Sequence, residues 1–231
     1  VLDMFNVKYT IEGGRMTPRA TAMGDGWFVQ EVKTYESTND EVRALGNKYE
    51  MKNAGSGKLL VNGKPVKSAK VYGGEKMQYV VAPGDSIGLG TPRSLGEDLT
   101  LYIAADSTGA ARFYQDAEIE RDSTNSLTKL VSINLIDGFN VRTQAVMLSS
   151  EAKKLSSKKF SGEGSVKMTS YAPNKLTYET SSSQKQLAVF SEVYYKKGWK
   201  AFVDGKEQEV LKVNYMLRGL ELPAGSHKVE F

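Results

Sequence analysis

The sequence predicts a mainly β protein: a β-sandwich with an inserted second β-rich module and one or two short helices. Two observations carry this prediction. Apolar and polar residues alternate with period two along most of the chain, which is the pattern of half-buried strands. The two-residue turn signals Asn62-Gly63 and Asp204-Gly205 each lie between strand-like runs, as in β-hairpins.

The composition narrows the function classes. The chain has 231 residues, enough for one large β domain or two smaller ones, and 40% of them are hydrophobic. A net charge of +4 from 31 basic and 27 acidic residues does not make the dense basic face that nucleic acids require. With no cysteine and one histidine, disulfides, thiol nucleophiles and Cys/His zinc sites are excluded. We therefore predict no nucleic-acid partner, no cofactor and no metal site.

The alternation of apolar and polar residues predicts individual strands along the chain. Residues 1–9 already have strand-forming composition, and Gly26-Trp27-Phe28-Val29 is an apolar run. Val166 and Met168 alternate with polar neighbours, as do Leu176 and Tyr178. The run Leu187-Ala188-Val189-Phe190 is apolar on both faces, which predicts a central strand covered on each side.

Two segments are predicted to be helical. Ser37 provides an N-cap, and Asp40 and Glu41 provide first-turn acids that favour a helix start. The second predicted helix runs from Ser126 to Leu135. The polar, basic segment Ser149 to Lys159 is interpreted as a solvated turn or a frayed helix.

An internal similarity accompanies the turn signals. Leu60-Val61-Asn62-Gly63-Lys64 parallels Phe202-Val203-Asp204-Gly205-Lys206. The similarity indicates either a duplication or two sandwiches that use the same hairpin. The second interpretation is favoured because few positions outside the turns agree.

Three polar motifs have a functional and a structural interpretation, and the structural one is favoured each time. Asp116, Glu118, Glu120 and Asp122 would share one face of a strand, either as calcium ligands or as a charged edge that prevents pairing. The glycine-rich segment 84–90 lacks the helix and the lysine of a phosphate-binding loop. Ser226 and His227 are strand neighbours that point to opposite faces, so they cannot form a local catalytic pair.

Aromatic side chains are the most plausible binding feature, because their flat faces suit the C–H patches of sugar rings. The predicted glycan-contact residues are Trp27, Tyr194, Tyr195 and Tyr215. The competing interpretation is that large aromatic residues are ordinary core and edge residues of sandwiches. Trp199 shares a face with Ala201 and Val203 and is predicted to be buried. No catalytic residue is predicted.

Several stretches together resemble a known family. The first two are Leu2-Asp3-Met4-Phe5-Asn6-Val7-Lys8-Tyr9, and Gly26-Trp27-Phe28-Val29 with Glu31-Val32-Lys33. The third is the C-terminal tail, which contains Tyr171-Ala172-Pro173-Asn174, Tyr194-Tyr195 and Gly198-Trp199-Lys200-Ala201-Phe202-Val203-Asp204-Gly205-Lys206. The tail continues with Asn214-Tyr215-Met216-Leu217-Arg218 and Pro223-Ala224-Gly225-Ser226-His227. This pattern is similar to the extracytoplasmic C-terminal region of YfhO-type bacterial multi-pass membrane proteins. The resemblance covers residues 1–45 and about 138–231. It leads us to expect a sandwich domain formed by residues 1–45 together with 137–231, and an inserted β-rich module at 46–136.

The resemblance also carries functional expectations. The family looks like membrane-embedded glycosyltransferases that use lipid-linked sugars, with the catalytic carboxylate in a loop between early membrane spans. We therefore expect a non-catalytic accessory domain on the extracytoplasmic face of a bacterial inner membrane. Its expected partners are the membrane-embedded remainder of the same polypeptide and a glycan or lipid-linked sugar. The first alternative is a stand-alone carbohydrate-binding or adhesion module of an exported surface protein. The second is a structural scaffold without a ligand, and a free-standing enzyme is the third and least favoured.

The chain ends add one further expectation. The chain starts and ends inside strand-like sequence, and no apolar run approaches the roughly 20 residues of a spanning helix. We therefore expect a fragment cut from a larger protein.

Overall fold

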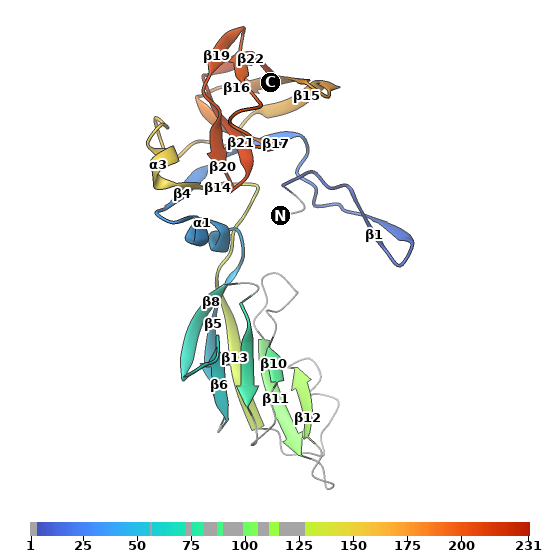
Figure 1. Ribbon diagram of the computed structural model, residues 1–231, viewed down its shortest axis with the longest axis vertical. Helices are drawn as coiled ribbons and strands as arrows, with labels where there is room; N and C mark the ends of the chain where they lie inside the picture. Colours follow the sequence, from blue (N-terminus) through green and yellow to red (C-terminus); the bar gives the residue numbers. More distant parts are fainter. Residues whose placement is uncertain are drawn as a thin grey trace. The chain divides into compact units, whose positions relative to one another are not determined.

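The computed structural model describes residues 4–55, 57–72, 75–80, 87–89, 99–105, 111–115 and 128–231. The chain divides into two compact units: the first is formed by residues 1–45 and 140–231, and the second by residues 46–139 (Figure 1). The sequence predicts these junctions after residues 45 and 136. The mainly β class is confirmed, with two short helices among the described residues.

The first unit is built on two antiparallel sheets. One has the order β15-β16-β22-β18-β19 and the other the order β20-β21-β17-β3. The strands of the first sheet are β15 (Ser165–Ala172), β16 (Lys175–Ser182), β22 (Gly225–Glu230), β18 (Ala201–Val203) and β19 (Lys206–Gln208). Those of the second are β20 (Leu211–Val213), β21 (Leu217–Leu222), β17 (Gln186–Val193) and β3 (Gly26–Val29).

The core of this unit is filled by inward-facing residues of both sheets. Tyr178 from β16, Phe190 from β17 and the terminal Phe231 meet edge to face, with ring centroids 4.9 to 5.9 Å apart. Each fully buried large side chain contributes roughly 1.5–3 kcal/mol of transfer free energy. Leu187 to Phe190 are all fully buried between β21 and β3, so the predicted central strand is confirmed.

Shorter elements complete the first unit. β4 (Glu31–Tyr35) and β14 (Gln144–Leu148) form a parallel pair. The helices are α1 (Thr38–Ala44) and α3 (Ser149–Ala152), and β1 (Tyr9–Glu12) pairs with β2 (Arg15–Pro18). Ser37 is the N-cap of α1 and accepts a hydrogen bond from the Asp40 amide, which confirms the first predicted helix.

The second unit also places a core between two sheets, with orders β10-β9-β6-β7 and β12-β11-β13-β5-β8. Its strands are β5 (Lys48–Asn53), β6 (Lys58–Val61), β7 (Lys64–Val66), β8 (Ser68–Tyr72), β9 (Met77–Val80), β10 (Ile87–Leu89), β11 (Leu99–Ala105), β12 (Ala111–Gln115) and β13 (Thr128–Asp137). Tyr49 and Met51 of β5 meet Leu59 and Tyr79 of the facing sheet.

The predicted helix from Ser126 to Leu135 is wrong. Residues Thr128–Asp137 form the strand β13, which pairs with β11 on one side and β5 on the other. Val131 and Ile133 point into the core with a period of two. β-Branched side chains lose rotamer freedom in a helix and pack well on a pleated sheet, so the tertiary pairing agrees with local propensity.

The two turn signals form the same turn. Asn62 and Gly63 have φ of 50° and 76°, and Asp204 and Gly205 have φ of 50° and 79°. Positive φ at both central residues is the requirement of a type I′ turn. The following strands differ, because β9 pairs with β6 whereas β21 pairs with β20 and β17. Among the described residues, the two units share this hairpin, whereas strands that follow it pair differently.

Two of the polar motifs are not located by the structure. Asp116, Glu118, Glu120 and Asp122 lie outside the described residues. In the glycine-rich segment 84–90, only β10 is described.

Candidate functional site

A cleft with aromatic and charged walls lies beside the loop that joins β17 to β18. Its volume is about 210 Å³. The loop contributes one wall, and the segment that begins in β19 contributes the other. The lining residues are Tyr194, Lys196, Trp199, Lys200, Glu207, Gln208, Glu209 and Val210.

The loop is shaped by backbone hydrogen bonds and one glycine. The Tyr194 amide donates to the Met216 carbonyl at 2.7 Å, and the amides of Gly198 and Trp199 both donate to the Tyr195 carbonyl. A Cβ atom at Gly198 would lie 2.3 Å from Cδ1 of the Tyr195 ring. Gly198 therefore allows the Tyr195 ring to fold across the turn.

Trp199 is supported from beneath by Arg218. The Arg218 guanidinium lies 4.3 Å from the centre of the Trp199 ring and 5.0 Å from that of Phe231. Only 2% of Arg218 is exposed. Its Nε donates to the Val193 carbonyl at 3.0 Å, and its Nη1 has no partner among the described residues. Stacking on aromatic faces compensates part of the desolvation of this buried charge.

Trp199 itself is only half-buried, so its predicted burial is partly wrong. It packs against the core and also lines the cleft. Alternation along the strand indicated its inward direction, but not the open space beside it.

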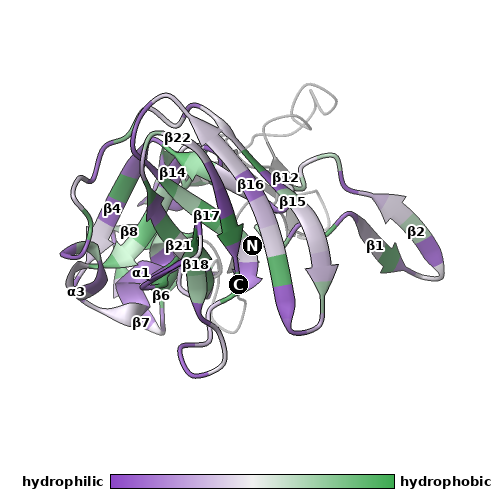
Figure 2. Ribbon diagram, turned by 90° about the horizontal axis from the view of Figure 1, so that it is seen from above, coloured by the Kyte–Doolittle hydropathy of each residue, from purple (hydrophilic) through white to green (hydrophobic). Residues whose placement is uncertain are grey.

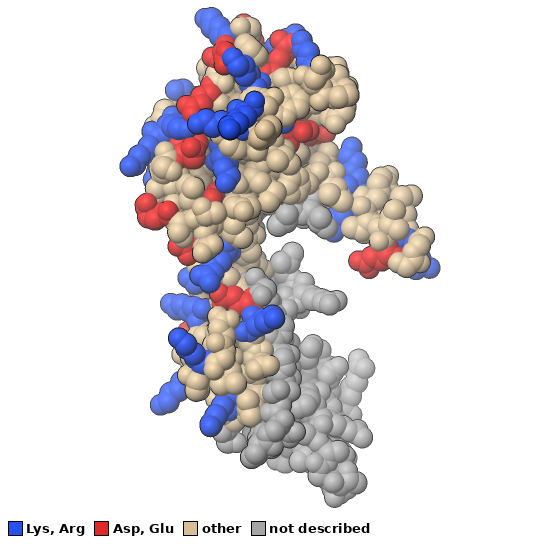
Figure 3. All heavy atoms as spheres, viewed as in Figure 1, with Lys and Arg blue, Asp and Glu red and all other residues tan. Residues whose placement is uncertain are grey.

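Opposite charges are paired along the cleft. Lys200 binds Glu207 at 3.1 Å, and Lys154 binds Glu209 at 2.6 Å. The hydrogen bond that Lys154 donates to Glu209 raises the pKa of Lys154. Burial raises the pKa of Tyr194, with the nearby Glu151 acting in the same direction, so its phenol remains a hydrogen-bond donor at neutral pH. Figure 3 shows how basic and acidic side chains intermix on one face of this unit.

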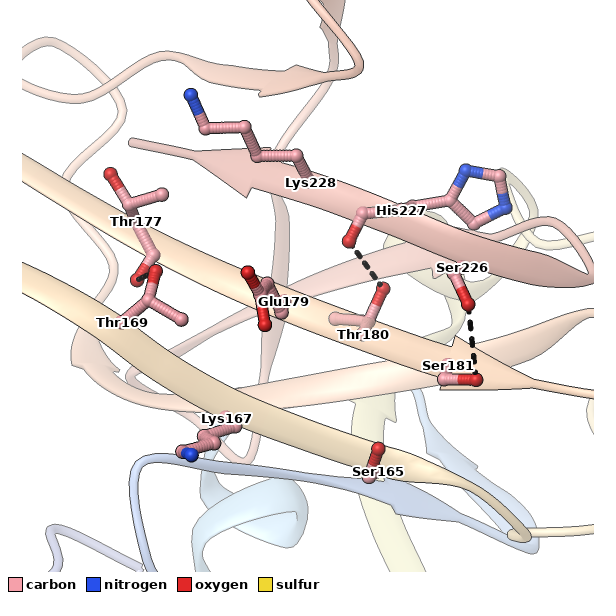
Figure 4. Close-up of a pocket in the computed structure, with 10 residues that line it drawn as sticks. All are labelled: Ser165, Lys167, Thr169, Thr177, Glu179, Thr180, Ser181, Ser226, His227 and Lys228. Atoms are coloured by element: carbon pink, nitrogen blue, oxygen red, sulfur yellow. Dashed lines mark hydrogen bonds between the residues drawn. The ribbon is translucent and has the colours of Figure 1, made fainter.

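A second, larger groove lies on the outer face of the β15-β16-β22 sheet, with a volume of about 460 Å³. The strand register sets a row of serines, Ser165–Ser181–Ser226, beside a charged row, Lys167–Glu179–Lys228. Figure 4 shows these hydroxyl and charged groups along three neighbouring strands. None of the described residues that line this groove is phenylalanine, tyrosine or tryptophan. Alternating polar residues on a solvated sheet face account for it without a ligand.

His227 and Ser226 do not act as a pair. The His227 Nδ1 lies 2.7 Å from Asp204 Oδ2, and its Nε2 lies 3.1 Å from the Ala224 carbonyl oxygen. Both neighbours are hydrogen-bond acceptors, so the doubly protonated imidazolium fits best, and Asp204 raises the pKa of His227. The Ser226 hydroxyl instead donates to Ser181. A cationic histidine is not a general base for serine.

The four predicted glycan-contact residues fall in three places. Tyr194 lines the cleft, and Tyr195 is exposed on the adjacent turn. Trp27 is a β3 residue with 8% of its surface exposed, which leaves little of its ring for a ligand. Tyr215 lies in a tight turn with φ of 69°, and the Lys212 ammonium is 4.7 Å from its ring centre. Neither Trp27 nor Tyr215 is among the residues lining the cleft.

Arg218 and Gly198 were quoted in the family resemblance, but no role was predicted for either. The sequence signal for the turn at Tyr195 was Gly198, which stands directly before Trp199 in a loop that follows a buried strand. The burial of Arg218 had no local signal. Within the described part of the chain, no cluster of three histidine, aspartate or glutamate side chains is arranged to hold a metal ion.

Comparison with known families relates the C-terminal part of the chain to a family of bacterial membrane proteins. Residues 118–231 match the family model described as Bacterial membrane protein YfhO, so this part of the chain is similar to that family. The match begins within the segment 46–136 that the sequence analysis assigned to an insert. No curated protein and no solved structure shows a significant match to the chain. None of the helices described here is both long enough and apolar enough to cross a membrane.

Proposed function

We propose that this chain is a non-catalytic, extracytoplasmic accessory domain of a YfhO-family membrane protein, and that the cleft beside Tyr194 and Trp199 contacts a glycan. The composition of the cleft supports this proposal most directly. Aromatic rings suit the C–H faces of sugars, and the Glu207, Gln208 and Glu209 side chains suit their hydroxyl groups.

The size of the cleft supports a weak contact with one sugar unit. At about 210 Å³ it is smaller than the roughly 300–1,000 Å³ typical of pockets for drug-sized ligands. We expect a dissociation constant on the order of 1 mM, equivalent to about −4 kcal/mol. Such a site holds or orients a glycan acceptor. In this proposal the glycosyl transfer itself takes place in the membrane-embedded remainder of the polypeptide.

Tryptophan fluorescence tests glycan contact directly. The chain contains two tryptophans, so Trp27→Phe leaves Trp199 as the single reporter beside the cleft. Titration of this variant with a panel of neutral and amino-sugar oligosaccharides should change the Trp199 emission for at least one sugar.

Two further variants provide the controls. Tyr194→Ala in the Trp27→Phe background removes one cleft wall and should abolish the response. Thr169→Ala, in the separate groove over β15, β16 and β22, should leave it unchanged. Absence of a response across the panel up to roughly ten times the expected dissociation constant would contradict the glycan contact.

The location is tested separately on the intact parent protein. An antibody against this domain should detect a band much larger than 25.4 kDa that resists carbonate extraction from membranes. Protease added to spheroplasts should remove the epitope without lysis. A small band in the soluble fraction would instead favour the stand-alone carbohydrate-binding or adhesion module.

A further inference from the structure

The hairpin formed by β1 and β2 has one apolar face and one polar face. Its register sets Tyr9 opposite Pro18 and Ile11 opposite Met16. The alternate positions are Thr10 with Thr17 and Glu12 with Arg15. Side chains of a strand alternate between faces, so all four residues of the first set share one side. Figure 2 shows β1 and β2 with hydrophobic and hydrophilic residues in alternation.

The apolar face is open to solvent. The exposed fractions are 73% for Ile11, 63% for Met16 and 55% for Tyr9. β1 and β2 form their own two-stranded sheet and pair with no other strand of the described chain. An isolated two-stranded hairpin is at best marginally stable in water, and exposed apolar patches commonly mark interaction sites. This face is therefore suited to being covered by a partner.

The base of the hairpin is fixed to the sandwich. The Asn6 side chain donates to Asp25 Oδ1 at 3.0 Å and accepts from the Gly24 amide at 3.1 Å, which joins the outgoing and returning chains. The Ser191 hydroxyl of β17 donates to the Gly24 carbonyl. At the tip, Gly13 and Gly14 have φ of 55° and 77°, as a type I′ turn requires. Both ends of the hairpin are thus defined by specific backbone geometry.

We propose that this apolar face docks onto the lipid surface of the membrane to which the YfhO-family protein belongs. Lys8 and Arg15 are exposed near the two ends of the hairpin, and Glu12 is the only acid within it. Arg15 lies on the polar face, but a single two-stranded layer is thinner than the screening length of salt solution, so the net positive charge still attracts anionic headgroups. Tyrosine beside aliphatic residues is the composition of the membrane–water interface. The hairpin has unpaired strand edges, which cannot enter the hydrocarbon region. It therefore lies flat at headgroup depth, with Ile11 and Met16 reaching the acyl boundary.

Vesicle co-sedimentation of the 231-residue chain tests this docking. The vesicles contain equal parts of phosphatidylglycerol and phosphatidylcholine, and a second set contains phosphatidylcholine alone. The chain should bind the anionic vesicles more strongly. Ile11→Ser with Met16→Ser should weaken binding by at least about tenfold, because each large apolar side chain contributes more than one tenfold step when buried.

The matched control is Thr10→Ser with Thr17→Ser on the polar face, which should bind like the unaltered chain. Circular dichroism of all variants should show unchanged strand content, since the hairpin lies outside the sandwich core. Failure of the unaltered chain to bind either vesicle would overturn the proposal, as would equal binding by both double variants. Self-association in sedimentation equilibrium that is lost with Ile11→Ser and Met16→Ser, without vesicle binding, would assign the face to a second copy instead.

Discussion

The guanidinium of Arg218 in β21 lies 4.3 Å from the centre of the Trp199 ring, which belongs to the loop between β17 and β18. The contact joins a buried charge to an aromatic residue that lines the cleft. Next to the Phe190–Arg218 pair, β17 contains a register shift between Phe190 and Val193. Bulges of this kind redirect side chains at functional edges of sheets.

Replacing Arg218 should separate the contribution of its volume from that of its charge. Arg218→Ala leaves a cavity and removes the cation that acts on Glu192, whose pKa is raised mainly by burial. We expect a loss of about 3 kcal/mol in the free energy of unfolding. Arg218→Met fills the space without the charge and should cost about 1 kcal/mol or less. Urea denaturation measures both, and equal losses would show that the charge contributes more than the packing.

The ion pair between His227 and Asp204 should make stability depend on pH. The pKa of His227 is raised from 6.5, so its contribution is present below that pH and is lost as pH rises through the folded value. The pKa of Asp204 is lowered from 3.8 by the same contact, so its contribution is lost only as pH falls through the lower folded value. Near pH 5 both groups are charged, and near pH 8.5 His227 has lost its proton. This pair should therefore make the melting temperature higher near pH 5 than near pH 8.5.

Asp204→Asn is the matched control for that pH dependence. It removes the charge while keeping an oxygen for the Lys228 amide, which donates to Asp204 Oδ1 at 2.9 Å. The part of the pH dependence due to His227 should then disappear. An identical pH profile in both proteins would contradict a role of this pair in stability.

Glu41 should destabilise the fold when it is ionised. Its Oε1 accepts the Tyr215 amide hydrogen at 3.1 Å, and its Oε2 has no partner among the described residues. Burial raises its pKa, so the folded state resists its ionisation and stability increases as pH falls through the folded pKa. Glu41→Gln should therefore raise the melting temperature at pH 7, and the gain should shrink as pH approaches 4.5. A lower melting temperature at pH 7 would show that the charge is stabilising.

The two type I′ turns allow each unit to be destabilised separately. A Cβ atom at Gly63 or Gly205 would meet no atom within 4 Å, so alanine there costs only the strain of positive φ. We expect about 1–2 kcal/mol for each substitution. Amide NMR during thermal unfolding should show that Gly63→Ala lowers the transition of residues 46–139, and that Gly205→Ala lowers that of the other unit. A joint shift of both transitions would mean that the units unfold together.

Local chemistry explains the parts of the fold that the sequence predicted. The alternation of Val166 with Lys167 fixes which face of β15 is buried, because neighbouring side chains of a strand point in opposite directions. Ser37 marks the start of α1 by capping its first turn. Gly13-Gly14 is also a two-residue turn signal, flanked by alternating apolar and polar residues. These two features together predict the hairpin of β1 and β2, which was not among the predicted elements.

The sequence by itself determined the strand class, the type I′ turns and the first helix, because each depends on residues within a few positions of one another. Only the tertiary structure decided that Arg218 lies under Trp199, that Glu41 lies against Tyr215, and that Trp27 is covered while Tyr194 lines a cleft. Those contacts join segments far apart in the chain. Burial is a property of the assembled sheets, which no short window of sequence contains.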